Sequence, residues 1–248
     1  MKQVVVNTLV FASDHEKGMS QLEMMGMLKE SGFKKVEVRR EYFRDIEAET
    51  QSIGEYARIH DFQVFYSVPE SLYDQGTLSV KAITSYFKEA QRMSCHHVKM
   101  IIGQYDEIKD EDVLMLNELS GAYGINLTVE NDQTVENGTV EKIFTFVKAF
   151  KRKGGKIGVT FDSGNWIWVT EDPIANAKKL ASDVVYIHIK DVSGTDDPQP
   201  TFLNKGKIPW KELLQILPEG IPVALEYPMG KTALQQLEQE YDIFVNLR

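Results

Sequence analysis

Short runs of hydrophobic residues, rich in valine and isoleucine, recur along the whole chain. Within each run the apolar residues mostly follow one another directly, a pattern typical of strands that are buried on both faces of a parallel sheet. The runs cover residues 3–11, 35–38, 62–68, 97–102, 125–130, 157–162, 184–189 and 222–227. Their spacing, roughly 25 to 40 residues, is that expected of repeated strand–helix units. We therefore predict eight parallel strands.

The segments between these runs have the period of amphipathic helices. Met24, Met25 and Leu28 share one helical face in the first segment, which is expected to end with a glycine cap at Gly32. Acidic residues open the segment that begins at Asp110, where they favour the helix dipole. The expected helical segments are residues 19–32, 77–93, 110–124, 139–155, 209–220 and 233–247.

Eight strands that alternate with helices predict a (β/α)8 TIM barrel, with one domain over residues 1–248. No linker or change of composition divides the chain. The alternative is an open, doubly wound sheet, which usually carries a glycine-rich phosphate turn after its first strand. Here the first run is followed by ASDHEKGMS, which has no GxGxxG pattern. The number of strands and the missing fingerprint favour the barrel.

Composition narrows the function classes. The chain has 248 residues, 42% of them hydrophobic, and a formal net charge of −9, which disfavours binding to nucleic acid. Its single cysteine, Cys95, allows no intrachain disulfide and suits a reducing compartment. The amino-terminal apolar run is too short for a membrane span and lacks a cleavage pattern. We expect a cytoplasmic protein with no nucleic-acid or membrane partner.

Four consecutive strands end on a side chain that can bind a metal. Glu130, Asp162, His188 and Glu226 occupy these ends. In a TIM barrel the carboxyl ends of the strands meet on one rim, which carries the functional groups. One such acid alone is often only a helix cap, but four in register are not expected by coincidence. Crowded carboxylates repel one another, and a divalent cation such as Mn, Mg, Co or Zn removes that conflict.

These residues lie in motifs that resemble a known superfamily, the xylose-isomerase-like TIM barrels. The motifs are VEVRRE, TVEND, FDSGN, YIHIKD and ALEY, and they occur in the family's order along nearly the whole chain. The superfamily includes sugar isomerases and epimerases and the AP endonuclease family 2 enzymes. The resemblance implies that Glu130, Asp162, His188 and Glu226 bind one metal ion. It also implies that Glu130 and Glu226 are catalytic and face the substrate carbon from opposite sides.

The chain departs from two subgroups of this superfamily. The DNA-repair members use three zinc ions and need further histidines, one of which would stand where Asn165 does, and residues 191–207 contain none. We therefore expect no AP endonuclease activity. The 3-epimerases of free ketoses have an arginine where Gly194 stands and a histidine at the position of Asn165. These differences count against that substrate class.

Other residues near the strand ends are candidates for substrate binding. Alternation along the second strand places Glu37 and Arg39 on one side, where we expect them to form an ion pair. The positive charges of three lysines suit a carboxylate or phosphate on a small polyol, and an aromatic side chain after the strand-six turn suits the face of a sugar. The complete set of substrate-binding candidates is Glu37, Lys99, Asn165, Trp166, Lys190 and Lys205.

The sequence favours a metal-dependent isomerase or epimerase that acts on a small sugar, sugar acid or polyol ketone through an enediolate. Two alternatives stay open: a dehydratase, in which the same enediolate expels a β-hydroxyl, and a barrel that binds a carbohydrate without turning it over. Fold alone does not fix the reaction, the substrate or the metal. The resemblance also allows a homodimer formed through the rim loops.

Overall fold

The computed structural model describes residues 2–246 and contains a closed barrel of eight parallel strands. The barrel strands are β1 (Val5–Asn7), β2 (Lys35–Arg39), β3 (Gln63–Asp74), β5 (His97–Gly103), β6 (Asn126–Glu130), β7 (Gly158–Asp162), β8 (Val184–Ile189) and β11 (Val223–Leu225). They pair in the order β2-β1-β11-β8-β7-β6-β5-β3, and β2 pairs with β3 to close the ring. The predicted TIM barrel is confirmed.

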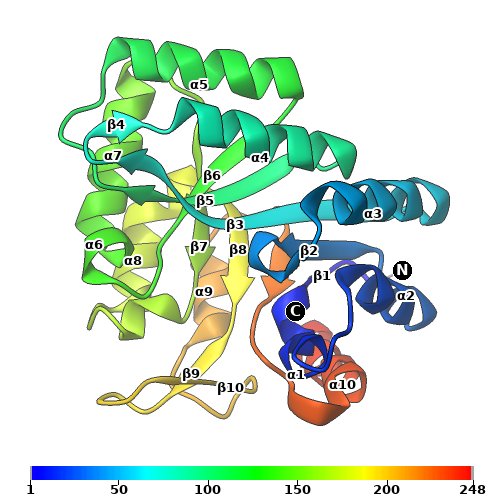
Figure 1. Cartoon of the computed structure of the whole chain (residues 1–248). Helices are drawn as coiled ribbons and strands as arrows, with labels where there is room; N and C mark the ends of the chain where they lie inside the picture. Colours follow the sequence, from blue (N-terminus) through cyan, green and yellow to red (C-terminus); the bar gives the residue numbers. More distant parts are fainter. Residues whose placement is uncertain (1, 247–248) are drawn as a thin grey trace.

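Helices surround the barrel (Figure 1). They are α1 (Ala12–His15), α2 (Gln21–Glu30), α3 (Ile46–His60), α4 (Val80–Arg92), α5 (Asp110–Tyr123), α6 (Val135–Gly138), α7 (Val140–Arg152), α8 (Pro173–Leu180), α9 (Trp210–Ile216) and α10 (Ala233–Val245). Within residues 2–246, none of them is long and apolar enough to cross a membrane.

Local sequence signals set the ends of several helices. A capping box formed by Ser20 and Glu23 starts α2, and the helix ends at Glu30, two residues before Gly32, which adopts a positive φ of 79°. Asp172 caps α8 through the backbone N–H of Ile174. The expected glycine stop at Gly32 is confirmed.

Two small additions lie outside the expected strand–helix repeat. The strand β4 (Thr77–Leu78) pairs antiparallel with the end of β3, where a longer helix was expected to begin. After β8 the chain forms a hairpin of β9 (Asp191–Ser193) and β10 (Gln199–Thr201), which projects from the barrel at the end to which β8 points (Figure 1). Both additions lie at the rim formed by the carboxyl ends of the strands.

Candidate metal centre

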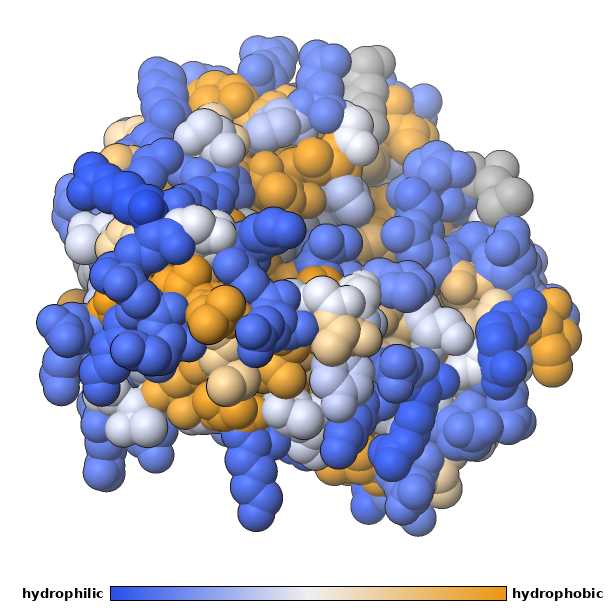
Figure 2. Space-filling model, turned by 90° about the horizontal axis from the view of Figure 1, so that it is seen from above, coloured by the Kyte–Doolittle hydropathy of each residue, from blue (hydrophilic) through white to orange (hydrophobic). Residues whose placement is uncertain are grey.

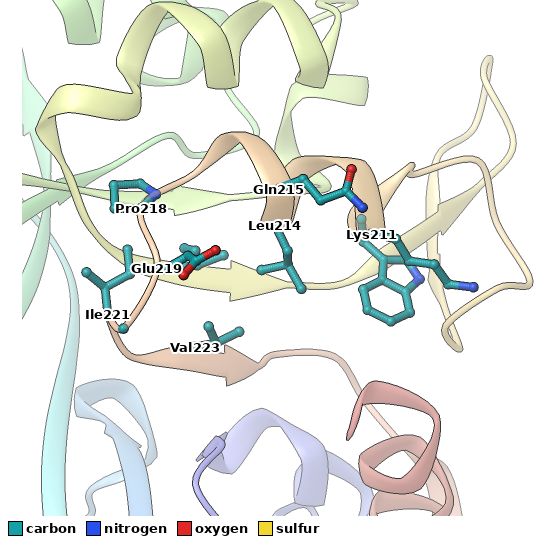
Figure 3. Close-up of a pocket in the computed structure, with 10 residues that line it drawn as sticks. Lys211, Leu214, Gln215, Pro218, Glu219, Ile221 and Val223 are labelled. Atoms are coloured by element: carbon teal, nitrogen blue, oxygen red, sulfur yellow. The ribbon is translucent and has the colours of Figure 1, made fainter. Parts of the chain in front are cut away.

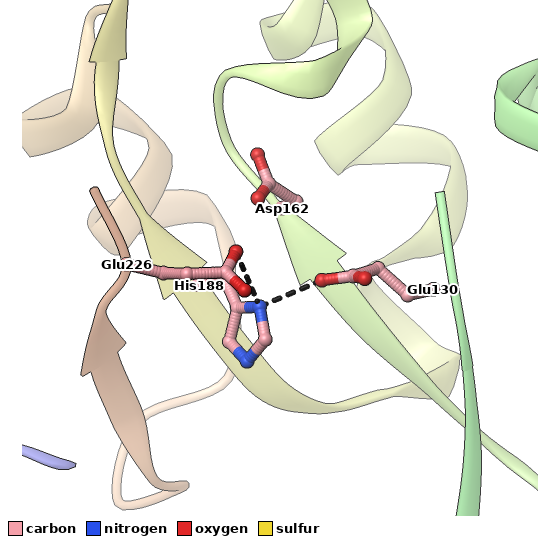
Figure 4. A group of neighbouring side chains, drawn as sticks. All are labelled: Glu130, Asp162, His188 and Glu226. Atoms are coloured by element: carbon pink, nitrogen blue, oxygen red, sulfur yellow. Dashed lines mark ion pairs between the residues drawn. The ribbon is translucent and has the colours of Figure 1, made fainter. Parts of the chain in front are cut away.

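The barrel brings the four predicted ligands together (Figure 4). Glu130 ends β6, Asp162 ends β7, His188 lies in β8, and Glu226 directly follows β11, so neighbouring strands present one residue each. One potential ligand atom from each of the four residues lies within 4.8 Å of the others, and none of the four residues is more than 5% exposed. We call these four residues the quartet.

One ring nitrogen of His188 meets two of the carboxylates. His188 Nδ1 lies 2.6 Å from Glu130 Oε1 and 3.1 Å from Glu226 Oε2, as the dashed lines in Figure 4 show. The other ring nitrogen, Nε2, lies 2.9 Å from Glu37 Oε2. Glu37 therefore fixes the ring from behind, so that Nδ1 points towards the centre of the quartet.

Each carboxylate of the quartet also has an oxygen that the protein holds from outside. Asp162 Oδ1 accepts hydrogen bonds from the backbone N–H groups of Gly164 (2.8 Å) and Asn165 (2.9 Å). Glu130 Oε2 accepts from Lys99 Nζ at 2.5 Å. We call these oxygens the outer atoms, and Glu130 Oε1, Asp162 Oδ2, Glu226 Oε2 and His188 Nδ1 the inner atoms.

The outer oxygen of Glu226 is held by residues from the first two strands. Glu226 Oε1 accepts from Arg39 at 2.9 Å and from the Asn7 amide at 3.1 Å. The same amide nitrogen of Asn7 donates to Glu37 Oε2 at 2.7 Å. Asn7 thus connects Glu37, which contacts His188, to Glu226.

The inner atoms fit a divalent cation. Among the described residues, Glu130 Oε1, Asp162 Oδ2 and His188 Nδ1 are buried and have ion-pair contacts, with each other or with Lys190, but no well-aligned hydrogen bond. Such buried polar atoms cost free energy unless something pairs with them. Three carboxylate oxygens and one imidazole nitrogen form a donor set that Mn, Mg, Co or Zn accepts. The quartet can therefore hold a metal ion, and its donor set does not select one of the four metals.

The close carboxylates of the site shift the pKa values of Asp162 and His188. Burial, together with the carboxylates of Glu226 and Glu130, raises the pKa of Asp162 to about 6, against the opposing effect of Lys190. Burial alone would lower the pKa of His188, but the carboxylates of Glu226, Glu37 and Glu130 raise it well above its usual value. Positive charge at the centre of the quartet is thus strongly favoured.

Two buried lysines flank the quartet. Lys99 on β5 is 4% exposed, and Lys190, between β8 and β9, is 5% exposed. Lys190 Nζ lies 2.8 Å from Asp162 Oδ2 and 3.7 Å from Glu226 Oε2. Burial opposes their charge, but the neighbouring carboxylates raise the pKa of both lysines, so both are cationic at neutral pH. Both predicted lysines therefore lie beside the quartet.

The three other candidates for substrate binding, Asn165, Trp166 and Lys205, differ in how far they are buried. Asn165 is buried, and its side chain donates to the backbone oxygen of Asn131 at 2.7 Å, which stabilises the turn after β7. Trp166 has no exposed surface and packs against Phe161. Lys205 is exposed, in the loop after β10. The structure thus buries two of these three candidates and leaves the third in solvent.

The expected ion pair between Glu37 and Arg39 is wrong. Arg39 instead pairs with Glu226 at 2.9 Å and with Glu41 at 2.6 Å, while Glu37 turns to His188 and Asn7. Sequence reasoning also missed Asn7, although the rule that found the quartet applies to it. It is the last residue of β1, so its polar side chain stands at a strand end like those of the quartet.

A surface pocket lies away from the quartet. Leu214, Ile221, Val223 and the ring of Trp210 line a cavity of about 530 Å³ between α9 and the start of β11 (Figure 3). It lies at the amino ends of the strands, the face that serves stability in TIM barrels. Figure 2 views the molecule from the side away from the β9–β10 hairpin and shows mostly hydrophilic residues with small hydrophobic groups between them. The quartet is the better candidate site.

Comparisons with known proteins agree with the fold. The family model described as xylose isomerase-like TIM barrel matches residues 25–246. No curated protein sequence matches the chain. Among solved structures, the probable 3-DHS dehydratase AsbF from Bacillus anthracis aligns with a TM-score of 0.74 and 14% identity, over 98% of this chain and 99% of that one.

Two further solved structures have the same fold. The IOLI protein, solved with a zinc atom, aligns with a TM-score of 0.73 and 15% identity, over 99% of this chain and 97% of that one. A D-tagatose 3-epimerase-like protein aligns with a TM-score of 0.71 and 20% identity, over 98% of each chain. At these identities the likeness establishes the fold alone.

Proposed function

The chain belongs to the xylose isomerase-like TIM barrel family, and we propose that it is a divalent-metal-dependent isomerase or epimerase of a small sugar, sugar acid or polyol ketone. One observation carries the proposal. The inner atoms of Glu130, Asp162, His188 and Glu226 converge within 4.8 Å, while the protein holds the opposite atom of each residue from outside. Such an arrangement preorganises a reactive centre.

The quartet would hold the cation, which would polarise a carbonyl and its neighbouring hydroxyl as a Lewis acid. The protein's own groups move the proton. Glu130 and Glu226 stand on different strands, and one of them removes a proton from the carbon beside the carbonyl, which gives an enediolate. General base catalysis of this kind contributes about two to four powers of ten in rate.

The fate of the enediolate decides the reaction. If the proton returns to the neighbouring carbon, an aldose and a ketose interconvert. If the second glutamate returns a proton to the opposite face of the same carbon, the substrate is epimerised. Proteins named as epimerases share this fold, including the D-tagatose 3-epimerase-like protein and an L-ribulose 3-epimerase. Both outcomes belong to the proposal.

The remaining candidates orient the substrate. The ammonium groups of Lys99 and Lys190 lie beside the quartet and donate to substrate oxygens. Lys205, on the exposed loop after β10, adds positive charge at the rim. Glu37, Asn165 and Trp166 act from buried positions, in which they shape the site.

A dehydratase is the second candidate. Expulsion of a β-hydroxyl needs a proton donor beside the leaving oxygen, and two buried, protonated lysines flank the quartet. The fold neighbour AsbF is described as a probable dehydratase, which supports this candidate. Elimination releases one water from the substrate, whereas isomerisation conserves its mass.

The test combines deuterium exchange with a mass balance. Protein loaded in turn with Mn, Co, Mg or Zn is incubated in D2O with a panel of ketoses, sugar acids and keto acids. An isomerase or epimerase incorporates one deuterium at the substrate carbon without loss of mass, and a dehydratase yields a product lighter by one water. Glu130→Gln should lower exchange by two or more powers of ten.

Lys178→Met, which changes an exposed residue of α8, serves as the control and should leave exchange unchanged. If compounds of the panel bind to the metal-loaded protein but none exchanges with any metal, the barrel binds carbohydrate without turning it over. If Glu130→Gln exchanges as fast as the wild type, the assigned base is wrong.

A further inference from the structure

Lys190 is held in place by its backbone as well as by its charge. Its N–H donates to Ser163 Oγ at 3.0 Å, and the Ser163 hydroxyl donates back to the Lys190 carbonyl at 2.9 Å. Its side chain passes over Gly164, where an added Cβ would lie 2.7 Å from Lys190 Cγ. The turn after β7 therefore fixes the direction from which the ammonium group enters the quartet.

The three cations around the quartet contact different sides of its carboxylates. Lys99 binds the outer oxygen of Glu130, and Arg39 binds the outer oxygen of Glu226, so both leave the inner atoms free. Lys190 instead lies 2.8 Å from the inner oxygen of Asp162 and 3.7 Å from the inner oxygen of Glu226. Of these three cations, Lys190 alone lies on the metal-facing side.

From this placement we infer that Lys190 is an internal cation that competes directly with the metal ion for Asp162 and Glu226, and so limits metal affinity. The inference rests on the proposed function, because it assumes that the quartet holds a metal. A divalent ion and a buried ammonium group repel each other when both use the same carboxylate oxygens. Binding of the metal then requires the ammonium group to turn away from Asp162.

The same displacement couples metal binding to substrate binding. A buried ammonium group is costly unless it has a partner, and substrate oxygens at the mouth of the site are the partners that become available. Lys190 would thus pass from the inner carboxylate oxygens to the substrate. Metal binding does not displace Lys99 or Arg39, because their partners are outer oxygens.

The test compares the Mn²⁺ affinity of four full-length proteins by isothermal titration calorimetry and by electron paramagnetic resonance of free Mn²⁺. Lys190→Met should bind Mn²⁺ at least tenfold more tightly than the wild type. Lys99→Met removes the same charge from the outer side, and should bind no more tightly than the wild type because Glu130 loses its support. Lys178→Met changes an exposed residue and should bind Mn²⁺ with the affinity of the wild type.

A second variant, Lys190→Gln, guards against poor folding of Lys190→Met and should also bind more tightly. Unchanged or weaker binding in both folded Lys190 variants would overturn the inference. Equal tightening in Lys99→Met and Lys190→Met would also overturn it, because the effect would then be general charge and not competition. Failure of every protein to bind Mn, Mg, Co or Zn would instead remove the metal centre itself, and the inference with it.

Discussion

Asn7 supports the site through a single amide group. It has no exposed surface, and its nitrogen donates to both Glu37 and Glu226. Its side-chain oxygen accepts from the backbone N–H of Leu9 at 2.9 Å, which fixes the orientation of the amide. One neutral residue therefore positions two carboxylates that would otherwise repel each other.

We predict that Asn7→Leu destabilises the fold by about 2–3 kcal/mol, because two buried carboxylates lose a hydrogen-bond donor. It should also weaken metal binding, since Glu226 and the ring of His188 lose their alignment. Urea unfolding and Mn²⁺ titration measure the two effects. Asn126→Ala, at an exposed position of β6, is the control. Equal stability of the two variants would contradict the role given to Asn7.

His97 gives the fold a dependence on pH. It is 9% exposed, near the amino end of β5, and burial lowers its pKa from 6.5 to about 4. Below pH 6.5 the unfolded chain binds a proton that the folded chain does not. The free energy of unfolding should therefore fall as the pH falls from 6.5 towards 4, by about 3 kcal/mol in all from this residue.

The check is urea unfolding at pH 7 and pH 5. In His97→Gln the loss of stability between these pH values should be smaller than in the wild type by about 2 kcal/mol. His96→Gln, which changes the exposed neighbour, should keep the wild-type dependence. An identical pH dependence of all three proteins would contradict the lowered pKa of His97, because it would mean that folding leaves this pKa unchanged.

The residues of the site differ in how far the sequence could predict them. Strand-end position identified the quartet, because a barrel brings all such ends to one rim. The same rule covers Asn7, whose neutral side chain gave no signal of metal binding. The partner of Arg39 could not be found, since the period of a strand indicates the side of the sheet but not the partner chosen from β11.

At the scale of elements, strands were easier to find than helices. The buried runs of Val and Ile mark every barrel strand, but α3 and α8 were not expected. The helix α3 buries only Thr50, Ile53, Gly54 and Ala57, so its apolar face is narrow. The strands of the β9–β10 hairpin have three residues each, and β10 is largely exposed, so neither strand is long enough to show a hydrophobic pattern in the sequence.

Gly54 allows α3 to approach α4 closely. A Cβ atom at this position would lie 1.9 Å from the carbonyl oxygen of Arg92, at the end of α4. Gly54→Ala should therefore force the two helices apart and destabilise the protein by about 1–3 kcal/mol, as overpacking does. Thermal and urea unfolding measure the change.

Gly121→Ala is the matched control within α5, because nothing lies within 4 Å of an added Cβ there. Alanine is the better helix former, so this change should be neutral or stabilise by up to about 1 kcal/mol. A stabilising Gly54→Ala would mean that the contact between α3 and α4 adjusts freely.

At the scale of the whole molecule, the number and regular spacing of the strands predicted the barrel. The order in which the strands pair around the ring depends on packing between segments that are distant in the sequence. The strand β2 closes the ring on β3, and β11 enters between β8 and β1. Strands β1, β2 and β5 supply supporting residues, whereas β6, β7, β8 and β11 carry the quartet. The site therefore draws on seven of the eight barrel strands.

Metal binding should consequently stabilise the entire fold. At a Mn²⁺ concentration one hundred times the dissociation constant, binding adds about 2.7 kcal/mol, which raises the melting temperature of a chain of 248 residues by about 5–10 °C. Asp162→Ala removes an inner atom and should abolish the shift. Differential scanning calorimetry with Mn²⁺ and with EDTA measures it, and an equal shift in Asp162→Ala would place the metal outside the quartet.

The position of Glu226 has a consequence for biosynthesis. A ribosome makes the chain from β1 onwards, and a domain generally folds as a unit. Glu226 follows β11, the last barrel strand in the chain, and is held by Asn7 and Arg39 from the first two. A nascent chain can thus contain Glu130, Asp162 and His188 while it still lacks both β11 and the fourth ligand, Glu226. Full metal affinity would then distinguish finished molecules from those whose translation stopped before β11.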